Sequence, residues 1–116
     1  MQPNDVLRLC AEIQKKKSED YQNQNSSVKQ ADYYPRGLSS IMDMINTKTL
    51  RMWSLLQNLE QDPKASSLNE SLEDSAIDLI NYATFFVAYC NYNIDGQDKS
   101  NDLFNRPKQW IHLLKQ

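Results

Sequence analysis

Three carboxylates spaced four residues apart are the clearest candidates for chemistry in this sequence of 116 residues. At 3.6 residues per turn, Glu70, Asp74 and Asp78 would lie along one side of a helix, and Asn81 and Tyr82 follow one turn later. Like charges at this spacing destabilise a helix by roughly 0.2 to 0.5 kcal/mol per pair. We therefore expect the row either to share a cation, which could be a metal ion, a lysine or an arginine, or to be solvated by water and salt.

The opposite side of the same segment is apolar, and we expect it to pack on other helices. Its residues are Leu72, Ala76, Leu79, Ala83, Phe86, Val87 and Cys90. From Leu79 to Cys90 the sequence is apolar almost all round, which indicates a helix that is covered on most sides. The acidic row would then be held against a protein core.

Lys48 is the basic residue best placed to meet that row. Residues 38–61 predict a long helix with an apolar side made of Ile41, Met44, Ile45, Met52, Leu55, Leu56 and Leu59. Lys48 falls in line with Met44 and Met52, and Arg51 lies at the edge of the same stripe. A lysine at such a position either extends its ammonium group to solvent or pairs with an acidic side chain on a neighbouring helix.

These segments belong to a predicted all-α domain that spans residues 1–116, an antiparallel bundle of three main helices plus a short C-terminal one. The first helix should begin between Pro3 and Asp5 and run to about Tyr21. The third should be capped by Ser67 or Asn69 and end between residues 91 and 96.

Two further segments connect or follow these helices. Residues 22–36 are polar and aperiodic, which is typical of a lid, a binding loop or a disordered connection, and Tyr33, Tyr34 and Arg36 there could stack on a base or contact phosphate. Pro107 opens a short amphipathic segment that carries Trp110, Ile111, Leu113 and Leu114. We expect this segment to dock on its own domain or on a second subunit.

Composition excludes several kinds of function. The formal net charge is -2, so no basic field attracts a nucleic-acid backbone. Cys10 and Cys90 stand alone, which predicts small core residues in a reducing cytoplasm rather than a zinc site or a disulfide framework. No apolar run approaches the about 20 residues of a membrane span, and no signal segment opens the chain, so we expect no membrane partner.

Catalysis by histidine or by a glycine-rich phosphate loop is also excluded. His112 is the only histidine, and Gly37 and Gly96 are the only glycines. Any catalysis must therefore use carboxylates, lysine, arginine and a metal.

Three segments together resemble the nucleotide modification associated domain (type 1) family of phage and bacterial proteins, which is similar to the MazG-like all-α nucleoside triphosphate pyrophosphohydrolases. These segments are KKSEDY at 16–21, GL at 37–38 leading to KTLR at 48–51, and ESLEDSAIDLINY at 70–82. The likeness covers roughly residues 6 to 92.

The resemblance implies a helical, often oligomeric domain that binds a nucleotide beside Mg²⁺. In the MazG-like enzymes, water attacks a phosphoryl group and the triphosphate is split into monophosphate and pyrophosphate. The resemblance predicts a homo-oligomer, either a dimer or a tetramer, that acts on dNTP or NTP. It also predicts that the protein works in the cytoplasm, which is the host cytoplasm if the protein is phage-encoded. Matched residue by residue, it assigns metal binding to Glu70, Asp74 and Asp78, catalysis to Glu73, Lys48 and Arg51, and nucleotide binding to Asp20, Tyr21, Lys48, Arg51, Asn81 and Tyr82.

The sequence also departs from these families. The MazG-like proteins carry an EExxE motif on the helix before the acidic one, where this chain has only Asp43 and the distant Glu60. Thr47 stands where an aspartate commonly precedes the lysine. Two alternatives therefore stay open: a noncatalytic nucleotide-binding protein, and a structural helical subunit in which Lys48 and Arg51 pair with the acidic row.

Overall fold

The computed structural model describes residues 1–21, 25–64 and 68–98, with side chains for all of these except residues 20, 21 and 68–71. Every regular element in these ranges is helical, which confirms the all-α class. The elements are α1 (Pro3–Tyr21), the short 3₁₀ helix η1 (Gln30–Tyr33), α2 (Leu38–Gln61) and α3 (Leu68–Cys90). The predicted C-terminal helix lies outside the described residues.

The ends of α2 are set by a glycine and a proline, and α3 ends in a turn with a positive φ. Gly37 precedes α2 with φ +63°, a left-handed conformation that glycine adopts without strain. Pro63, which has no N–H, follows the last residues of α2. After α3, Tyr92 takes φ +60° and the Asn93 N–H donates to the Ala88 carbonyl at 3.0 Å, so the chain turns sharply away.

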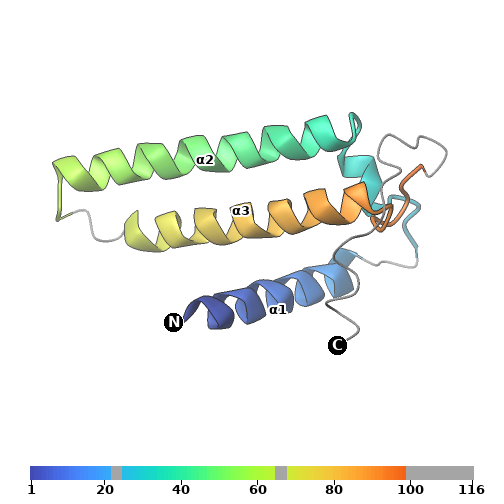
Figure 1. Ribbon diagram of the computed structural model, residues 1–116, viewed down its shortest axis with the longest axis horizontal. Coiled ribbons are helices and arrows are strands. Elements are labelled where there is room, and N and C mark those ends of the chain that lie inside the picture. Colours follow the sequence, from blue (N-terminus) through green and yellow to red (C-terminus); the bar gives the residue numbers. More distant parts are fainter. Residues whose placement is uncertain (22–24, 65–67, 99–116) are drawn as a thin grey trace.

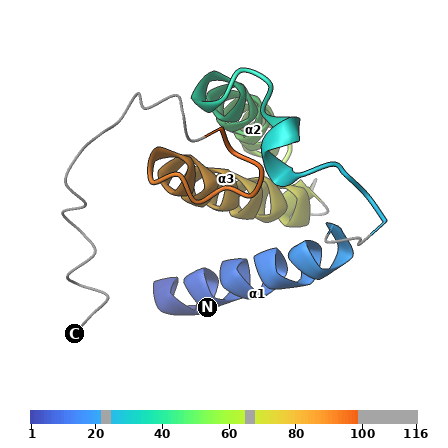
Figure 2. The same cartoon turned by 90° about the vertical axis from the view of Figure 1, so that its right-hand side faces the viewer.

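Helix α3 lies between the other two long helices (Figure 1). It packs closely against α2, which runs in the opposite direction, and more lightly against α1, which runs in the same direction as α3. Figure 2 shows α1 inclined to α3 and on its far side from α2. Within the described residues α1 does not contact α2, and the long helix against which each of them packs is α3.

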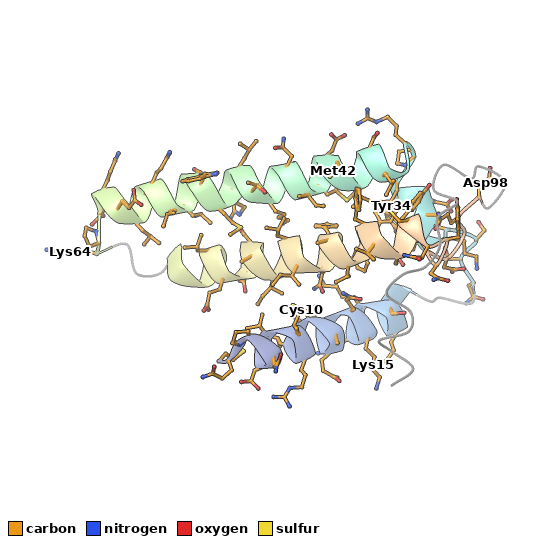
Figure 3. The ribbon with its side chains drawn as sticks, in the orientation of Figure 1. Cys10, Lys15, Tyr34, Met42, Lys64 and Asp98 are labelled. Carbon is orange, nitrogen blue, oxygen red and sulfur yellow. The ribbon has the colours of Figure 1, made fainter. Side chains whose placement is uncertain are left out.

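The buried core gathers at the end where α2 begins and α3 ends. Tyr34, Ile41 and Ile94 are buried there, and the side chain of Tyr34 lies between η1 and the helix ends (Figure 3). Partly buried side chains surround them, namely Ala31, Met44, Ile45, Phe85, Phe86, Ala88 and Tyr89. This end is thus built from two stretches, residues 31–45 and 85–94, that lie far apart in the sequence.

The connection between α1 and α2 is more regular than its sequence predicts. Residues Gln30–Tyr33 form η1, and the Ala31 N–H donates to the Asp95 carbonyl at 2.9 Å. The Gln97 side-chain amide donates to the Tyr89 carbonyl at 2.8 Å. These contacts join the connection to the segment that follows α3.

The two cysteines lie on helices and are free thiols. Cys10 is buried on the side of α1 that faces α3, and Lys15 projects from the opposite side (Figure 3). Cys90 is partly buried. The expectation of small core residues is confirmed for Cys10.

The apolar side of α3 is less covered than we predicted. Val87 is 59% exposed and Ala83 is also exposed, while Leu72, Ala76 and Leu79 are partly buried. We call these five residues the open face of α3. The prediction that this side packs on other helices is wrong for Ala83 and Val87, whereas Phe86 packs against the core and Cys90 is partly buried.

No helix in the described ranges is both long and apolar enough to cross a membrane.

Candidate functional site

An ion pair between α2 and α3 forms the centre of the candidate site. The Lys48 Nζ lies 3.0 Å from the Asp78 Oδ2, and the two side chains are 26% and 35% exposed. Lys48 projects from the inner side of α2 because it falls one turn from both Met44 and Met52. The sequence allowed Lys48 either to reach solvent or to pair with the acidic row, and in the structure it pairs with Asp78 of that row.

The other acidic residues of the row lie at different distances from this pair. Asp74 is one turn before Asp78 and exposed, and Glu73 is exposed on the adjacent side of the helix. Glu70 belongs to the first turn of α3, but its side chain lies outside the described residues. Asp78 is therefore the member of the row whose charge is balanced by a described partner.

The second predicted cation is not part of this pair. Arg51 lies three residues after Lys48 on α2, is exposed, and forms no ion pair with a described side chain. A helix rises about 1.5 Å per residue, so its Cα is about 4.5 Å along the axis from that of Lys48. The guanidinium is free to reach a ligand bound near Lys48.

Asn81 and Tyr82 take two different places on α3. The buried Asn81 Oδ1 accepts a hydrogen bond from the Gln14 amide of α1 at 2.7 Å, and the same amide donates to the Thr84 hydroxyl at 2.8 Å. The Tyr82 ring is partly buried and packs edge-on against Phe85, with ring centroids 6.1 Å apart. Asn81 thus joins α1 to α3, a role that required Gln14, which we did not single out from the sequence.

Asp20 and Tyr21 are the last two residues of α1, and their side chains lie outside the described residues. Through Gln14 and Asn81, the helix that carries them is hydrogen-bonded to α3.

The tyrosine segment before α2 does not meet the ion pair. Lys48 is ten residues after Leu38, so it lies about 15 Å along α2 from the helix start. Tyr34 instead lines a pocket of about 660 Å³ together with Arg36, Tyr89 and other residues at that end. The Arg36 guanidinium pairs with Asp43, so this pocket offers a ligand aromatic rings rather than an unpaired positive charge.

The environment of Tyr34 alters its ionisation. Burial raises the pKa of the Tyr34 phenol above its usual value because the ionised form would be poorly solvated, and the nearby Tyr82 acts in the same direction. A hydrogen bond from the Gln30 amide to the Tyr34 hydroxyl, at 3.2 Å, opposes the rise. The neutral phenol is therefore a structural part of the core.

The described carboxylates allow a test of whether Mg²⁺ would fit. No group of three or more Asp, Glu, His or Cys side chains within the described residues is arranged to share a metal. Asp74 and Asp78 are one turn apart, and Mg²⁺ commonly takes one or two carboxylates together with substrate phosphates and waters. This pair of carboxylates fits such a partly hydrated ion if Lys48 leaves Asp78.

The fold and the site define an all-helical protein in which Lys48 and Asp78 form an ion pair across its two most closely packed helices. Comparisons of the chain with protein-family models, with curated proteins and with solved structures give no match. The family resemblance therefore rests on the three sequence segments and stays a prediction.

Proposed function

We propose that this chain is a Mg²⁺-dependent (deoxy)nucleoside triphosphate pyrophosphohydrolase, or a related phage nucleotide-processing protein. The observation that carries the proposal is the ion pair between Lys48 and Asp78. It joins two of the three segments that resemble the nucleotide-processing families, KTLR at 48–51 and ESLEDSAIDLINY at 70–82. A lysine beside helix-borne carboxylates is a suitable arrangement for binding a phosphate chain together with a divalent ion.

In this proposal Asp74 and Asp78 hold the metal, with Glu70 as a third ligand. Bound Mg²⁺ would neutralise phosphate charge and orient the attacking water. When substrate enters, the Lys48 ammonium group leaves Asp78 and binds a phosphate oxygen. Lys48 thus pairs with Asp78 in the free protein and with the substrate in the complex. Glu73, exposed next to Asp74, accepts a hydrogen bond from the attacking water.

The remaining residues bind and orient the nucleotide. Arg51 is exposed and follows Lys48 by three residues, so its guanidinium can stabilise negative charge on the same phosphate chain. Tyr82 offers an aromatic edge, while Asn81, already bonded to Gln14, keeps α1 against α3. Asp20 and Tyr21 follow Gln14 by six and seven residues on a helix that runs in the same direction as α3, so the end of α1 points toward the end of α3 and not toward Asp78.

The test is to incubate the purified protein with each standard dNTP and NTP, with Mg²⁺ or with EDTA, and to resolve monophosphate and pyrophosphate. We expect metal-dependent pyrophosphate release that is lost in Asp78→Asn. Asp43→Asn is the matched control, because Asp43 is an exposed carboxylate on α2 whose partner is Arg36. Equal loss in both variants, or release that persists in Asp78→Asn, would contradict the assignment.

A second candidate is a nucleotide-binding protein that does not hydrolyse its ligand. The favouring observation concerns α2, whose two acidic residues are Asp43, which pairs with Arg36 and is 66% exposed, and Glu60, which is exposed in the last turn. Within the described residues no group of three acidic side chains joins a carboxylate of α2 to those of α3. This candidate predicts thermal stabilisation by nucleotide without product after long incubation, because a ligand that binds only the folded state raises the unfolding free energy.

A structural subunit is the third candidate, and the same ion pair favours it because Lys48 and Asp78 already satisfy each other. It predicts no stabilisation by any nucleotide or divalent ion. A nucleotide-dependent rise in the melting temperature would rule it out.

We further propose that the chain forms a homo-oligomer, a dimer or tetramer, through the outer side of α2. Leu50, Trp53 and Leu56 are 60%, 59% and 37% exposed and recur every three residues on that helix. Contiguous exposed apolar side chains commonly mark a protein interface. Light scattering after size exclusion should give a multiple of 13.5 kDa for the native chain and a smaller mass for Leu50→Asp.

A further inference from the structure

The open face of α3 continues to the end of the molecule at which the described chain stops. Leu79, Ala83 and Val87 follow one another at four-residue spacing, and the exposed fraction of Val87 is 59%. Eight residues of helix separate the first from the last, a length of about 12 Å. The face is therefore long enough for two turns of another helix.

The described chain ends at the same end of the molecule as this face. Gln97 is hydrogen-bonded to the Tyr89 carbonyl in the last turns of α3, and Asp98 lies at the same end of the molecule (Figure 3). Residues 99–106 can span at most about 26 to 29 Å when extended, which exceeds the length of the face. The amphipathic segment that begins at Pro107 is thus within reach.

Charge and pattern favour the same pairing. Four of the thirteen Lys and Arg residues but one of the fifteen Asp and Glu residues belong to residues 99–116, which gives that segment a formal charge of +3 against -5 for residues 1–98. Trp110, Leu113 and Leu114 would share one side of a helix that starts at Pro107. An apolar, positively charged segment therefore follows an acidic domain whose open face is exposed at Ala83 and Val87.

We propose that residues 107–114 pack as a helix on the open face of α3 in the same molecule, with Trp110, Leu113 and Leu114 facing inward. The short connection holds the segment at an effective concentration in the millimolar range. This favours the chain's own segment over a second copy at ordinary protein concentrations. The outer side of α2 stays available for the oligomer interface.

The test uses the full chain with Trp53→Phe, which leaves Trp110 as its sole tryptophan. Trp53 is 59% exposed, so its replacement should preserve the helices. We expect blue-shifted Trp110 emission and acrylamide quenching several-fold weaker than in the urea-unfolded chain. Adding Val87→Asp should remove this protection, whereas Ser18→Asp, an exposed site on α1, should leave it intact.

Circular dichroism reports whether each variant keeps its helices, and Ala83→Lys serves as a second disruption of the same face. Trp110 that is fully accessible to acrylamide in the Trp53→Phe chain would overturn the proposal. Protection that disappears on dilution would assign the face to a second copy, and protection that survives both Val87→Asp and Ala83→Lys would place the segment elsewhere. Either result would also overturn it. None of these measurements depends on the proposed nucleotide activity.

Discussion

Removal of the charges on Lys48 and Asp78, singly and together, tests whether the pair links α2 to α3. Lys48→Met keeps the aliphatic stem, and Asp78→Asn keeps the side-chain shape. At a separation of 3.0 Å two unit charges attract by about 5 kcal/mol for an effective dielectric constant of about 20. Desolvation and side-chain ordering offset most of this attraction, and exposed pairs retain only about 0.2 to 1 kcal/mol.

Because 26% and 35% of the two side chains remain in contact with water, we expect a coupling energy of about 1 kcal/mol, at the upper end of that range. Each single variant should lower the melting temperature by about 3 to 6 °C, and the double variant should be little less stable than either. Urea unfolding of the four proteins, followed by circular dichroism, gives the coupling energy directly.

The pair between Arg36 and Asp43 is the matched control, because both of its side chains are 66% exposed and it lies outside the contact between α2 and α3. Arg36→Gln and Asp43→Asn should couple by no more than about 0.3 kcal/mol. High salt should weaken the control pair more than the partly buried one. A coupling energy for Lys48 and Asp78 no larger than that of the control would refute the role of this pair in holding the helices together.

Three further predictions concern the contacts around the site. Gln14→Ala should cost about 1 kcal/mol and speed amide exchange in α1 more than in α2, since Asn81 loses its donor across the interface; equal changes in both helices would contradict this. The raised pKa of Tyr34 means that its stabilising contribution is complete below about pH 10 and is lost as pH rises through the folded value. Tyr34→Phe should therefore reduce the fall in unfolding free energy above about pH 10, measured by urea unfolding. An unchanged pH profile would show that Tyr34 does not cause this fall. Gly37→Ala should lower the unfolding free energy by about 1 to 3 kcal/mol, because φ is +63° and the new Cβ would lie 2.8 Å from the Tyr89 hydroxyl oxygen. Adding Tyr89→Phe should relieve the clash but not the backbone strain. An unchanged unfolding free energy for Gly37→Ala would show that the turn can relax.

Much of the fold follows from local signals in the sequence. The apolar spacing of residues 38–61, together with Gly37 before and Pro63 after it, predicts α2 as it is observed. The start of α1 at Pro3 lies within the predicted range, and α3 begins at Leu68, between the two residues expected to cap it. Segment η1 was missed because its four residues have no apolar period, and it is held by the Ala31 hydrogen bond to the distant Asp95.

The candidate site could be predicted in part. The position of Lys48 on the apolar stripe allows a partner on a neighbouring helix as one of two outcomes, and its pairing with Asp78 needs only that α2 and α3 be neighbours in opposite directions. The bond between Gln14 and Asn81 could not be foreseen, since a glutamine on an amphipathic helix carries no sign of which helix it will meet. The resemblance assigns Asn81 to nucleotide binding, whereas in the structure the Asn81 side chain accepts a hydrogen bond from Gln14 of α1.

The sequence by itself determined the three long helices, the bounds of α2 and the polarity of each helix side, because these depend on spacing along the chain and on residues that stop a helix. Only the tertiary structure decided which side of each helix is covered. On α3, Asp78 and Asn81 face α2 and α1, while Val87 stays exposed on the open face. The physical reason is that a polar side chain with a partner across an interface can be covered at little cost, and whether it has that partner depends on how helices distant in sequence cross.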